Sequence, residues 1–395
     1  MGLTRIENIE VKSKRVFVRV DFDVRIENGN ILESSRIEKV IPTIELLYGK
    51  GAKVIIGTHL GNPGGSVNPE YSVRPLIDKL STLLDKTVIA PETNNIDDWI
   101  KKSKDIKDGD ILFLENLNYF PGEEENSPEF AKKLSELCDI FVNDAFSISH
   151  KSLASTVGIT DHVPSVPGTL LYREIETFQN LVNKPEKPFL AIFGGSKVSS
   201  KIKILNSLLP RVTNILIGGA MAYTFLKSRA VPVGSSVIEK DFEVLSHQFI
   251  DKAGIGGIEI LLPVDHIIAD SYSKKAKTKS VDRMGIIDGW MGMDIGSKTV
   301  SLFEKTIKNA GTIFWNGPMG VIEFDKFSNG TLQIAKAISK SNAKSIIGGF
   351  DTVEAVYKAG VENKITHLST GGEACLEFLE GKQLPGIIAL GKERE

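Results

Sequence analysis

Short, almost continuously apolar runs alternate along this chain with longer amphipathic segments. Strands that are covered by helices on both faces read this way, because neither face of the sheet meets water. The runs fall into two groups, at 15–21, 52–59, 110–116 and 139–145, and then at 188–195, 214–219, 258–265, 311–317, 345–349 and 366–371. Helical patterns such as 127–138 and 201–209 separate them. This alternation of strand and helix predicts an α/β fold with parallel sheets.

The chain has 395 residues, which is more than one typical hydrophobic core accommodates. Proline-rich stretches at 164–167 and 183–188 enclose one helical pattern at 169–182, an arrangement typical of a connector between domains. The predicted division is an N-terminal domain at 1–168, a hinge helix and linker at 169–187, a C-terminal domain at 188–380, and a tail at 381–395 that packs back on the N-terminal domain.

Composition narrows the function classes. The formal net charge of −2 gives no sign of the basic excess that nucleic-acid binding usually needs. The two cysteines, Cys138 and Cys375, are expected to be reduced thiols, and the start of the sequence lacks the apolar core of a secretory signal. No apolar run is long enough to span a bilayer. We therefore expect a cytoplasmic protein with neither a nucleic-acid nor a membrane partner.

Glycine-rich turns follow the strands of the second half and precede helical patterns. They lie at 194–198, 218–222, 316–320, 348–352 and 370–374. Glycine lets backbone N–H groups approach a ligand closely, and the start of a helix favours an anion. One such turn is weak evidence, but five in one domain predict a surface that holds phosphates. Neither a GxxxxGK[ST] loop nor a GxGxxG opening of the first βαβ unit is present.

Charged residues accompany these turns. Lys197 and Lys201 are four apart where a helix is expected to begin, so both can point the same way and stabilise a phosphoryl group in transfer. A solvent-exposed helix face is the alternative. Asp351 follows a Gly-Gly turn and is a plausible Mg²⁺ ligand, although it could equally cap its helix.

The strand ends of the first half carry polar side chains instead of glycine turns. These are Arg19, Asp21, His59, Asn116, Asn118, Asn143 and Asp144, with His150 and Lys151 shortly after. Ligands in open α/β sheets bind beyond the carboxyl ends of the strands. Any one of these residues could serve a structural hydrogen bond, but together they predict a site for a small anionic molecule.

The same residues fall within blocks that resemble the ordered motifs of the phosphoglycerate kinase family. The blocks are RVDFDV, THLGNP, LFLENLNY, FVNDAFSISHK, AIFGGSKVSSKI, IGGAMAYTF, LPVD, WMGMDIG, WNGPMGVIEFDKF, IGGFDTV and HLSTGGEACLEFLEGKQLPG, from about residue 15 to about 386. The resemblance implies two Rossmann-like, three-layer αβα domains joined by a hinge. It also implies a monomer that moves a phosphoryl group reversibly between 1,3-bisphosphoglycerate and ADP, giving 3-phosphoglycerate and ATP with Mg²⁺.

Residue roles follow from the resemblance alone. The nucleotide would contact Gly195 and Gly219 at adenine, Glu323 at the ribose, and Lys197, Lys201, Asn316, Gly348, Gly349, Phe350 and Thr352 at the phosphates, with Asp351 at Mg²⁺. The catalytic set would be Arg36, Lys197, Lys201, Gly349 and Phe350. The acceptor would contact Arg19, Asp21, Asp23, Arg36, His59, Asn62, Asn118, His150 and Lys151.

Several positions depart from the family pattern. Asn62 and Asn118 stand where arginines are expected, Lys151 replaces a third arginine, and Asp23 replaces an asparagine. Each lost charge-assisted hydrogen bond to a phosphate costs roughly 1.5–3 kcal/mol. The departures leave three hypotheses open: phosphoglycerate kinase itself, a related kinase that phosphorylates a less anionic carboxylate, and a weakly active nucleotide-binding protein. Phe350 and Glu373, both in glycine positions of the family, motivate the third.

Overall fold

The computed structural model describes residues 2–27, 29–31, 33–282 and 285–392. The chain divides into two compact units, one formed by Met1–Glu176 with Gln383–Glu395 and the other by Thr177–Lys382. The division falls within helix α6 (Thr169–Asn183) and again just after Lys382. Residues 393–395 of the predicted tail lie outside the described residues.

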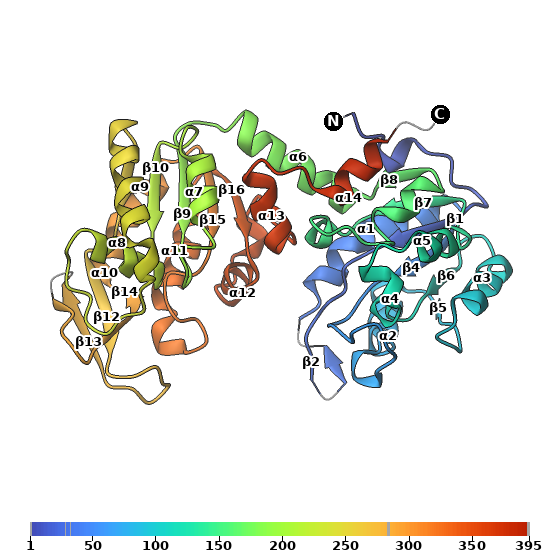
Figure 1. Ribbon diagram of the computed structural model, residues 1–395, viewed down its shortest axis with the longest axis horizontal. Helices are drawn as coiled ribbons and strands as arrows, with labels where there is room; N and C mark the ends of the chain where they lie inside the picture. Colours follow the sequence, from blue (N-terminus) through green and yellow to red (C-terminus); the bar gives the residue numbers. More distant parts are fainter. Residues whose placement is uncertain (1, 28, 32, 283–284, 393–395) are drawn as a thin grey trace. The chain divides into compact units, whose positions relative to one another are not determined.

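The N-terminal unit is built on a six-stranded parallel sheet in the order β5-β6-β4-β1-β7-β8 (Figure 1). Its strands are β1 (Arg15–Arg19), β4 (Lys53–Gly57), β5 (Val88–Ile89), β6 (Ile111–Phe113), β7 (Ile140–Asn143) and β8 (Ser165–Pro167). Its longer helices are α1 (Ser35–Gly49), α2 (Pro75–Leu84), α3 (Ile96–Asp105) and α5 (Pro128–Ser135), with the single turns α4 (Pro121–Glu124) and α14 (Pro385–Ile388). A short antiparallel hairpin joins β2 (Ile26–Glu27) and β3 (Asn30–Ile31).

The C-terminal unit repeats this plan with the strand order β11-β10-β9-β15-β16-β17, again entirely parallel. The strands are β9 (Phe189–Phe193), β10 (Asn214–Ile217), β11 (Glu259–Leu261), β15 (Thr312–Asn316), β16 (Lys344–Gly348) and β17 (His367–Leu368). The helices are α7 (Ile202–Leu208), α8 (Met221–Ser228), α9 (Glu243–Ile255), α10 (Ser297–Lys308), α11 (Asn329–Ser339), α12 (Phe350–Lys358) and α13 (Gly372–Leu379).

The central strands are buried along nearly their whole length, which explains their continuous apolar sequence. Every residue of β9 is buried, and in β1 the side chains of Val16, Phe17 and Val18 are fully covered. Burying an aliphatic or aromatic side chain contributes about 1.5–3 kcal/mol, so these strands anchor the two cores. The predicted α/β class with parallel sheets is confirmed.

Two features differ from the sequence-based expectations. Residues 165–167 lie in a proline-rich stretch for which no strand was predicted, but they form the edge strand β8, where proline is tolerated because one side of the strand needs no ladder hydrogen bond. The run 258–265 is not one strand, because β11 ends at Leu261 and Asp265 opens β12 of a separate sheet.

That separate sheet is antiparallel and was not predicted. It consists of β12 (Asp265–Ala269), β13 (Thr278–Asp282) and β14 (Met291–Ile295), in the order β13-β12-β14. The outer strand β13 is largely exposed and reads TKSVD, so it carries no apolar run that could have indicated a strand.

Two neighbouring residues at the end of β7, Asn143 and Asp144, hold segments that are distant in sequence. The Leu171 N–H at the start of α6 donates to Asp144 Oδ1 at 2.9 Å. Asn143 Nδ2 donates to the Gly386 carbonyl at 3.4 Å, and the Gly386 N–H donates to the Ser149 carbonyl at 3.0 Å. Residues 383–392 therefore complete the N-terminal unit. None of the helices in the described part of the chain has the length and hydropathy of a membrane span.

Candidate active site

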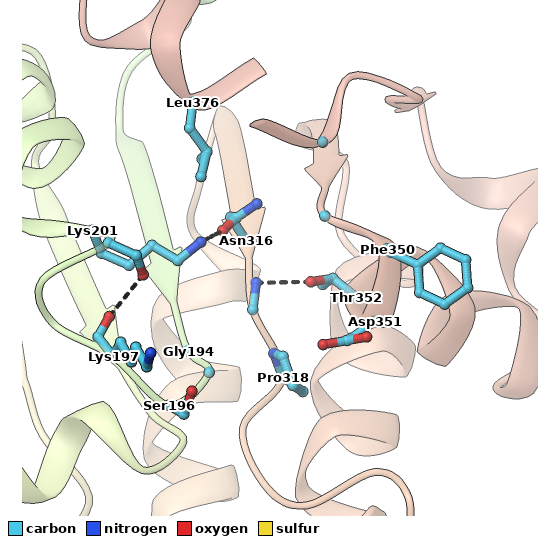
Figure 2. Close-up of a pocket in the computed structure, with 15 residues that line it drawn as sticks. Gly194, Ser196, Lys197, Lys201, Asn316, Pro318, Phe350, Asp351, Thr352 and Leu376 are labelled. Atoms are coloured by element: carbon cyan, nitrogen blue, oxygen red, sulfur yellow. Dashed lines mark hydrogen bonds between the residues drawn. The ribbon is translucent and has the colours of Figure 1, made fainter. Parts of the chain in front are cut away.

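Four of the predicted glycine turns meet at one pocket, at the carboxyl ends of β9, β15, β16 and β17. The pocket is lined by Gly194, Gly195, Ser196, Lys197, Ser200, Lys201, Asn316, Gly317, Pro318, Gly349, Phe350, Asp351, Thr352, Gly372 and Leu376 (Figure 2). Parallel strands end at the same edge of a sheet, so turns that are far apart in sequence come together there. We call this pocket the phosphate pocket.

Glycine is required in these turns because the backbones touch. A Cβ atom added at Gly194 would overlap the carbonyl oxygen of Pro318, and one at Gly317 would overlap the carbonyl oxygen of Gly194. Gly317 also has a φ of +98°, which side chains rarely allow. The Gly195 N–H donates to the Pro318 carbonyl at 2.8 Å, and this fixes the two turns against each other.

Both predicted lysines line the phosphate pocket, but the reason given for their alignment was wrong. Helix α7 begins at Ile202, so Lys201 is its N-cap and Lys197 lies in the preceding turn. The ammonium group of Lys201 donates to Asn316 Oδ1, as Figure 2 shows, and Asn316 Nδ2 donates to the Gly348 carbonyl at 2.9 Å. Burial lowers the pKa of Lys201, while Lys197 is exposed.

Helix α12 begins beside the phosphate pocket, at the turn after β16. Its N-cap is Gly349, with a φ of +93°, so the alternative reading of Asp351 as the cap was wrong. Thr352 Oγ1 accepts the Gly317 N–H at 2.7 Å and joins this turn to the one after β15. The ring of Phe350 is 57% exposed and points away from Lys201 in Figure 2, so it leaves the pocket open.

A second, more apolar pocket adjoins the first and shares Gly195, Ser196, Pro318 and Asp351 with it. Its other lining residues are Gly219, Ala220, Tyr223, Val237, Tyr272, Met291, Gly292, Met293, Met319, Gly320, Val321, Ile322 and Glu323. The turn after β10 lines this pocket alone, whereas the turns after β9, β15 and β16 line both pockets. We call it the nucleoside pocket, because an apolar pocket that opens onto a phosphate site has the form that a nucleoside needs.

The apolar lining was missed at the sequence level, because methionine, valine and tyrosine there carry no pattern that distinguishes them from core residues. Asp351 stands between the two pockets. Desolvation raises its pKa, nearby Glu323 raises it further, and Lys201 opposes both.

In the N-terminal unit the predicted polar residues form a hydrogen-bonded group at the ends of β1 and β4. Arg36 Nη1 donates to Asp21 Oδ2 at 2.7 Å, and the Ser147 hydroxyl donates to the same oxygen. Burial is the largest single effect on the pKa of Asp21 and raises it, but attraction to Arg36 acts together with the other neighbouring groups and hydrogen bonds to outweigh burial, so the pKa of this buried carboxyl is lowered. Ser147 was missed, since a lone serine beyond a strand carries no distinguishing signal.

Arg19 lies behind this group and is fully buried. It faces Glu123 at 3.6 Å, donates to Ser155 Oγ at 2.7 Å, and lies 3.4 Å from His59 Nδ1. Burial lowers the pKa of His59 to about 4 in spite of nearby Asp21, so the imidazole is neutral at pH 7. Arg19 thus holds His59 from the core side, and its guanidinium does not reach solvent.

The departures from the family pattern cluster around one loop. Asp23 Oδ1 accepts the Gly61 N–H at 2.9 Å, and Asn118 Nδ2 donates to the Gly61 carbonyl at 3.2 Å. Asn62 is exposed, and its Oδ1 accepts the Gly64 N–H at 3.3 Å. Asp23 and Asn118 therefore shape the loop that carries Asn62.

Other basic residues near the proposed acceptor site differ in their partners and in their exposure. Arg25 pairs with Glu27 at 2.5 Å, and Arg74 lies 3.7 Å from Glu115 while donating to the Pro91 carbonyl. Lys151 is exposed, and His150 is half-buried just before it. Lys151 is close enough to His59 to oppose its protonation.

An α/β chain with a glycine-built phosphate pocket, an adjoining nucleoside pocket and a separate group of anion-binding side chains has the features of a nucleotide-dependent phosphotransferase. The family model "Phosphoglycerate kinase" matches residues 6–382. A curated relative from Leptospira biflexa named phosphoglycerate kinase is 56% identical over the full length of both chains. One of the same name from Clostridium botulinum (strain Langeland) is 46% identical over 98% of both.

Solved structures agree with these relatives. Phosphoglycerate kinase from Coxiella burnetii is 38% identical, with a TM-score of 0.88 over 98% of this chain and 99% of that one. The enzyme from Pyrococcus horikoshii is 32% identical, with a TM-score of 0.85 over 98% of both. The chain belongs to the phosphoglycerate kinase family. It is therefore an enzyme that transfers a phosphoryl group between a nucleotide and a carboxyl group, and neither alternative hypothesis is favoured.

Proposed function

We propose that the chain catalyses reversible phosphoryl transfer between 1,3-bisphosphoglycerate and ADP, with the nucleotide in the C-terminal unit and the phosphoglycerate in the N-terminal unit. The observation that carries this proposal is the convergence of four glycine turns and two lysines on one pocket that opens onto a nucleoside pocket. Membership of the family supports the reaction itself.

The nucleotide is divided between the two pockets. Adenine lies against Gly195 and Gly219, because the position of a Cβ atom on Gly195 is open space that a flat ring can occupy, and Glu323 accepts hydrogen bonds from the ribose hydroxyls. The phosphates reach into the phosphate pocket beside Lys197, Lys201 and Asn316, and beside the turn from Gly349 to Thr352. Backbone N–H groups at the start of α12 favour the anion.

Asp351 fits the role of Mg²⁺ ligand. Among the described residues no group of three or more acidic, histidine or cysteine side chains could hold a metal ion by itself. Mg²⁺ in kinases needs no such cage, because one or two carboxylates, water and the phosphates suffice. The raised pKa of Asp351 indicates a carboxylate short of positive charge, which a bound Mg²⁺ supplies while it neutralises the nucleotide phosphates.

Positioning and charge stabilisation account for the transfer, and no covalent enzyme intermediate is needed. Lys201 and the N–H groups of Gly349 and Phe350 stabilise the phosphoryl group in transfer, and Phe350 contributes its backbone alone because its ring points outward. Arg36 lies against the reacting carboxyl group. Its hydrogen bond to Asp21 fixes the guanidinium in place before substrate arrives.

The acceptor is held with fewer positive charges than the family pattern provides. Arg36, Lys151 and His150 supply contacts, Asp21 orients Arg36, and buried Arg19 positions His59 without touching the substrate. Asn62 and Asn118 offer amide groups where arginines are expected, and Asp23 holds the loop between them. We therefore expect 3-phosphoglycerate to bind more weakly than the nucleotide.

The buried positions of both cysteines support a cytoplasmic location, and we propose a monomer, as the family resemblance implies. Closure of the two domains about the hinge remains a prediction.

An assay of the purified protein tests the function. We would measure ADP formation with MgATP and 3-phosphoglycerate, and use glycerate and acetate at equal concentration as matched controls that lack the phosphate. Saturable turnover that is at least tenfold faster with 3-phosphoglycerate than with either control is expected. Equal rates with all three carboxylates, or turnover with glycerate alone, would contradict the proposed acceptor.

A further inference from the structure

The side chain of Glu239 grips the turn that carries both lysines. Glu239 Oε2 accepts the Ser199 N–H at 3.0 Å, and Oε1 accepts the Ser199 hydroxyl at 2.6 Å. Ser199 lies midway between Lys197 and Lys201, in the turn that leads into α7. A carboxylate beside a phosphate pocket is electrostatically unfavourable for an anionic ligand, so its placement there needs a reason.

Glu239 is itself held in place by residues near the nucleoside pocket. Its N–H donates to Thr224 Oγ1 at 3.1 Å, and Thr224 is buried in α8, which follows the glycine turn after β10. Two residues earlier, Val237 lines the nucleoside pocket with 59% of its side chain exposed. Ser236 Oγ accepts the Gly292 N–H at 2.9 Å, and Gly292 lines the same pocket.

Residues Ser236–Glu239 therefore span the distance between the two pockets, and we call them the strap. One end of the strap contacts the place proposed for the nucleoside, and the other end holds the lysine turn by two hydrogen bonds to one residue. Bonds of this kind to an ionised carboxylate are the stronger class, and a pair of them fixes direction as well as distance.

Within the turn, the Ser200 hydroxyl donates to the Lys197 carbonyl at 3.0 Å and the Lys201 N–H donates to the Val198 carbonyl at 2.8 Å. These internal bonds shape the turn but do not locate it against the rest of the unit. The bonds from Ser199 to Glu239 do so from outside.

We infer that Glu239 is a positioning residue that sets Lys197 and Lys201 at the correct distance from the nucleoside pocket. It acts through Ser199 and touches neither substrate. This inference rests on the proposed placement of the nucleotide. It predicts that loss of Glu239 weakens the hold on the phosphates while the nucleoside is bound as before.

Calorimetry with adenosine and with ADP separates the two parts of the site. For Glu239→Ala we expect ADP to bind about tenfold more weakly and adenosine to bind within about twofold of the unchanged protein. Unchanged adenosine binding also shows that the variant is folded. Glu239→Gln keeps one acceptor oxygen and an amide that can donate to the Ser199 hydroxyl. We therefore expect its loss of ADP affinity, expressed as a logarithm, to be about half of that in Glu239→Ala.

Two further variants sharpen the test. Ser199→Ala should weaken ADP binding, and combining it with Glu239→Ala should add little, because both changes remove the same contact. Asp241→Ala removes an exposed acid two residues beyond the strap and serves as the matched control, with both affinities unchanged. In steady-state assays kcat should fall for Glu239→Ala while KM for 3-phosphoglycerate stays the same.

The inference is wrong if Glu239→Ala leaves ADP affinity unchanged, if adenosine and ADP lose affinity equally, or if the effects of the two substitutions add. A separate measurement isolates the underlying proposal, because ADP affinity that survives neutralisation of Lys197 and Lys201 would remove the nucleotide from this pocket altogether. ADP binding that needs the lysines but ignores Glu239 would overturn the positioning role alone.

Discussion

The two units share one architecture but build their sites from different materials. In the C-terminal unit the phosphate pocket is formed largely by glycine turns at the strand ends, whose backbones pack against one another. In the N-terminal unit the proposed acceptor site is made of side chains, with Arg36 held by Asp21 and with His59 held by buried Arg19. A backbone site depends on the path of the chain, while a side-chain site depends on the identity of each residue.

This difference explains which departures from the family pattern matter. Phe350 stands where the family has glycine, yet its N–H is unchanged and its ring points outward. Asn62 and Asn118 alter the acceptor site itself, since a neutral amide replaces a charged, forked donor. A single departure from the family pattern thus has a smaller chemical consequence in the C-terminal unit than in the N-terminal unit.

The largest expected effect comes from the charged side chains of the backbone-built pocket. Replacing Lys197 and Lys201 by alanine together should lower kcat by about 10³-fold or more, because charge on the transferring group loses two positive partners. A coupled assay measures the loss, and unchanged adenosine binding controls for folding. Turnover within tenfold of the unchanged protein would show that the backbone alone suffices.

In the side-chain-built site, the buried ion pair behind His59 is expected to matter for stability. Arg19→Met leaves Glu123 buried without its partner and should cost about 3–5 kcal/mol in the free energy of unfolding, measured by urea denaturation. Lys133→Met removes an exposed pair with Asp97 and should change that free energy by less than about 1 kcal/mol. Equal losses in the two variants would contradict the distinction.

The same region should respond to pH. Burial lowers the pKa of His59 from 6.5 to about 4, so between these values the unfolded chain takes up a proton that the folded chain does not. Stability therefore falls as the pH drops from 6.5 toward 4, by on the order of 3 kcal/mol from this group. His59→Gln should flatten the dependence over that interval. Urea denaturation at a series of pH values measures this dependence. If the free energy of unfolding varies with pH in the same way in His59→Gln as in the unchanged protein, the pKa of His59 is not lowered by folding.

The backbone-built pocket should be sensitive to single methyl groups. Gly194→Ala places a Cβ against the Pro318 carbonyl and should cost about 1–3 kcal/mol in the free energy of unfolding. Gly254→Ala lies in helix α9 with open space around the added methyl, and should stabilise by about 0.5–1 kcal/mol. Thermal unfolding measures both, and a loss at Gly254 as large as that at Gly194 would refute the steric argument.

The smallest effect concerns the altered acceptor loop. Asn62→Arg restores a charged donor at an exposed position and should lower the KM for 3-phosphoglycerate by about tenfold, with no change in the KM for ATP. Asn118 is a poorer place for the same change, because it is buried and its amide holds the Gly61 carbonyl. If Asn62→Arg leaves the KM for 3-phosphoglycerate unaltered, the position does not face the phosphate.

Much of the fold was predictable because the central strands are buried on both faces, and such strands are recognisable in the sequence as apolar runs. The antiparallel sheet was not, since β13 is exposed and polar. Strand β8 was concealed by its prolines, which favour a connector in sequence but are tolerated at a sheet edge.

The site shows the same contrast. The glycine turns could be found from their repetition after successive strands. Ser147, Glu123 and Glu239 could not, because a lone serine or glutamate reads as surface until the fold brings its partner near. The alignment of the two lysines was expected from a shared helix. That helix begins at Ile202, one residue after Lys201 and five after Lys197, so the turn before it places both side chains.

Residues 383–392 pack within the N-terminal unit, where Leu384 and Ile387 are almost fully covered. A ribosome adds them only after residues 177–382, the entire C-terminal unit, have been made. During translation the unit that is synthesised first therefore lacks part of its interior, and its apolar surface waits for the last segment to emerge. The second unit, continuous in sequence, can close its core earlier, so the order of completion is the reverse of the order of synthesis.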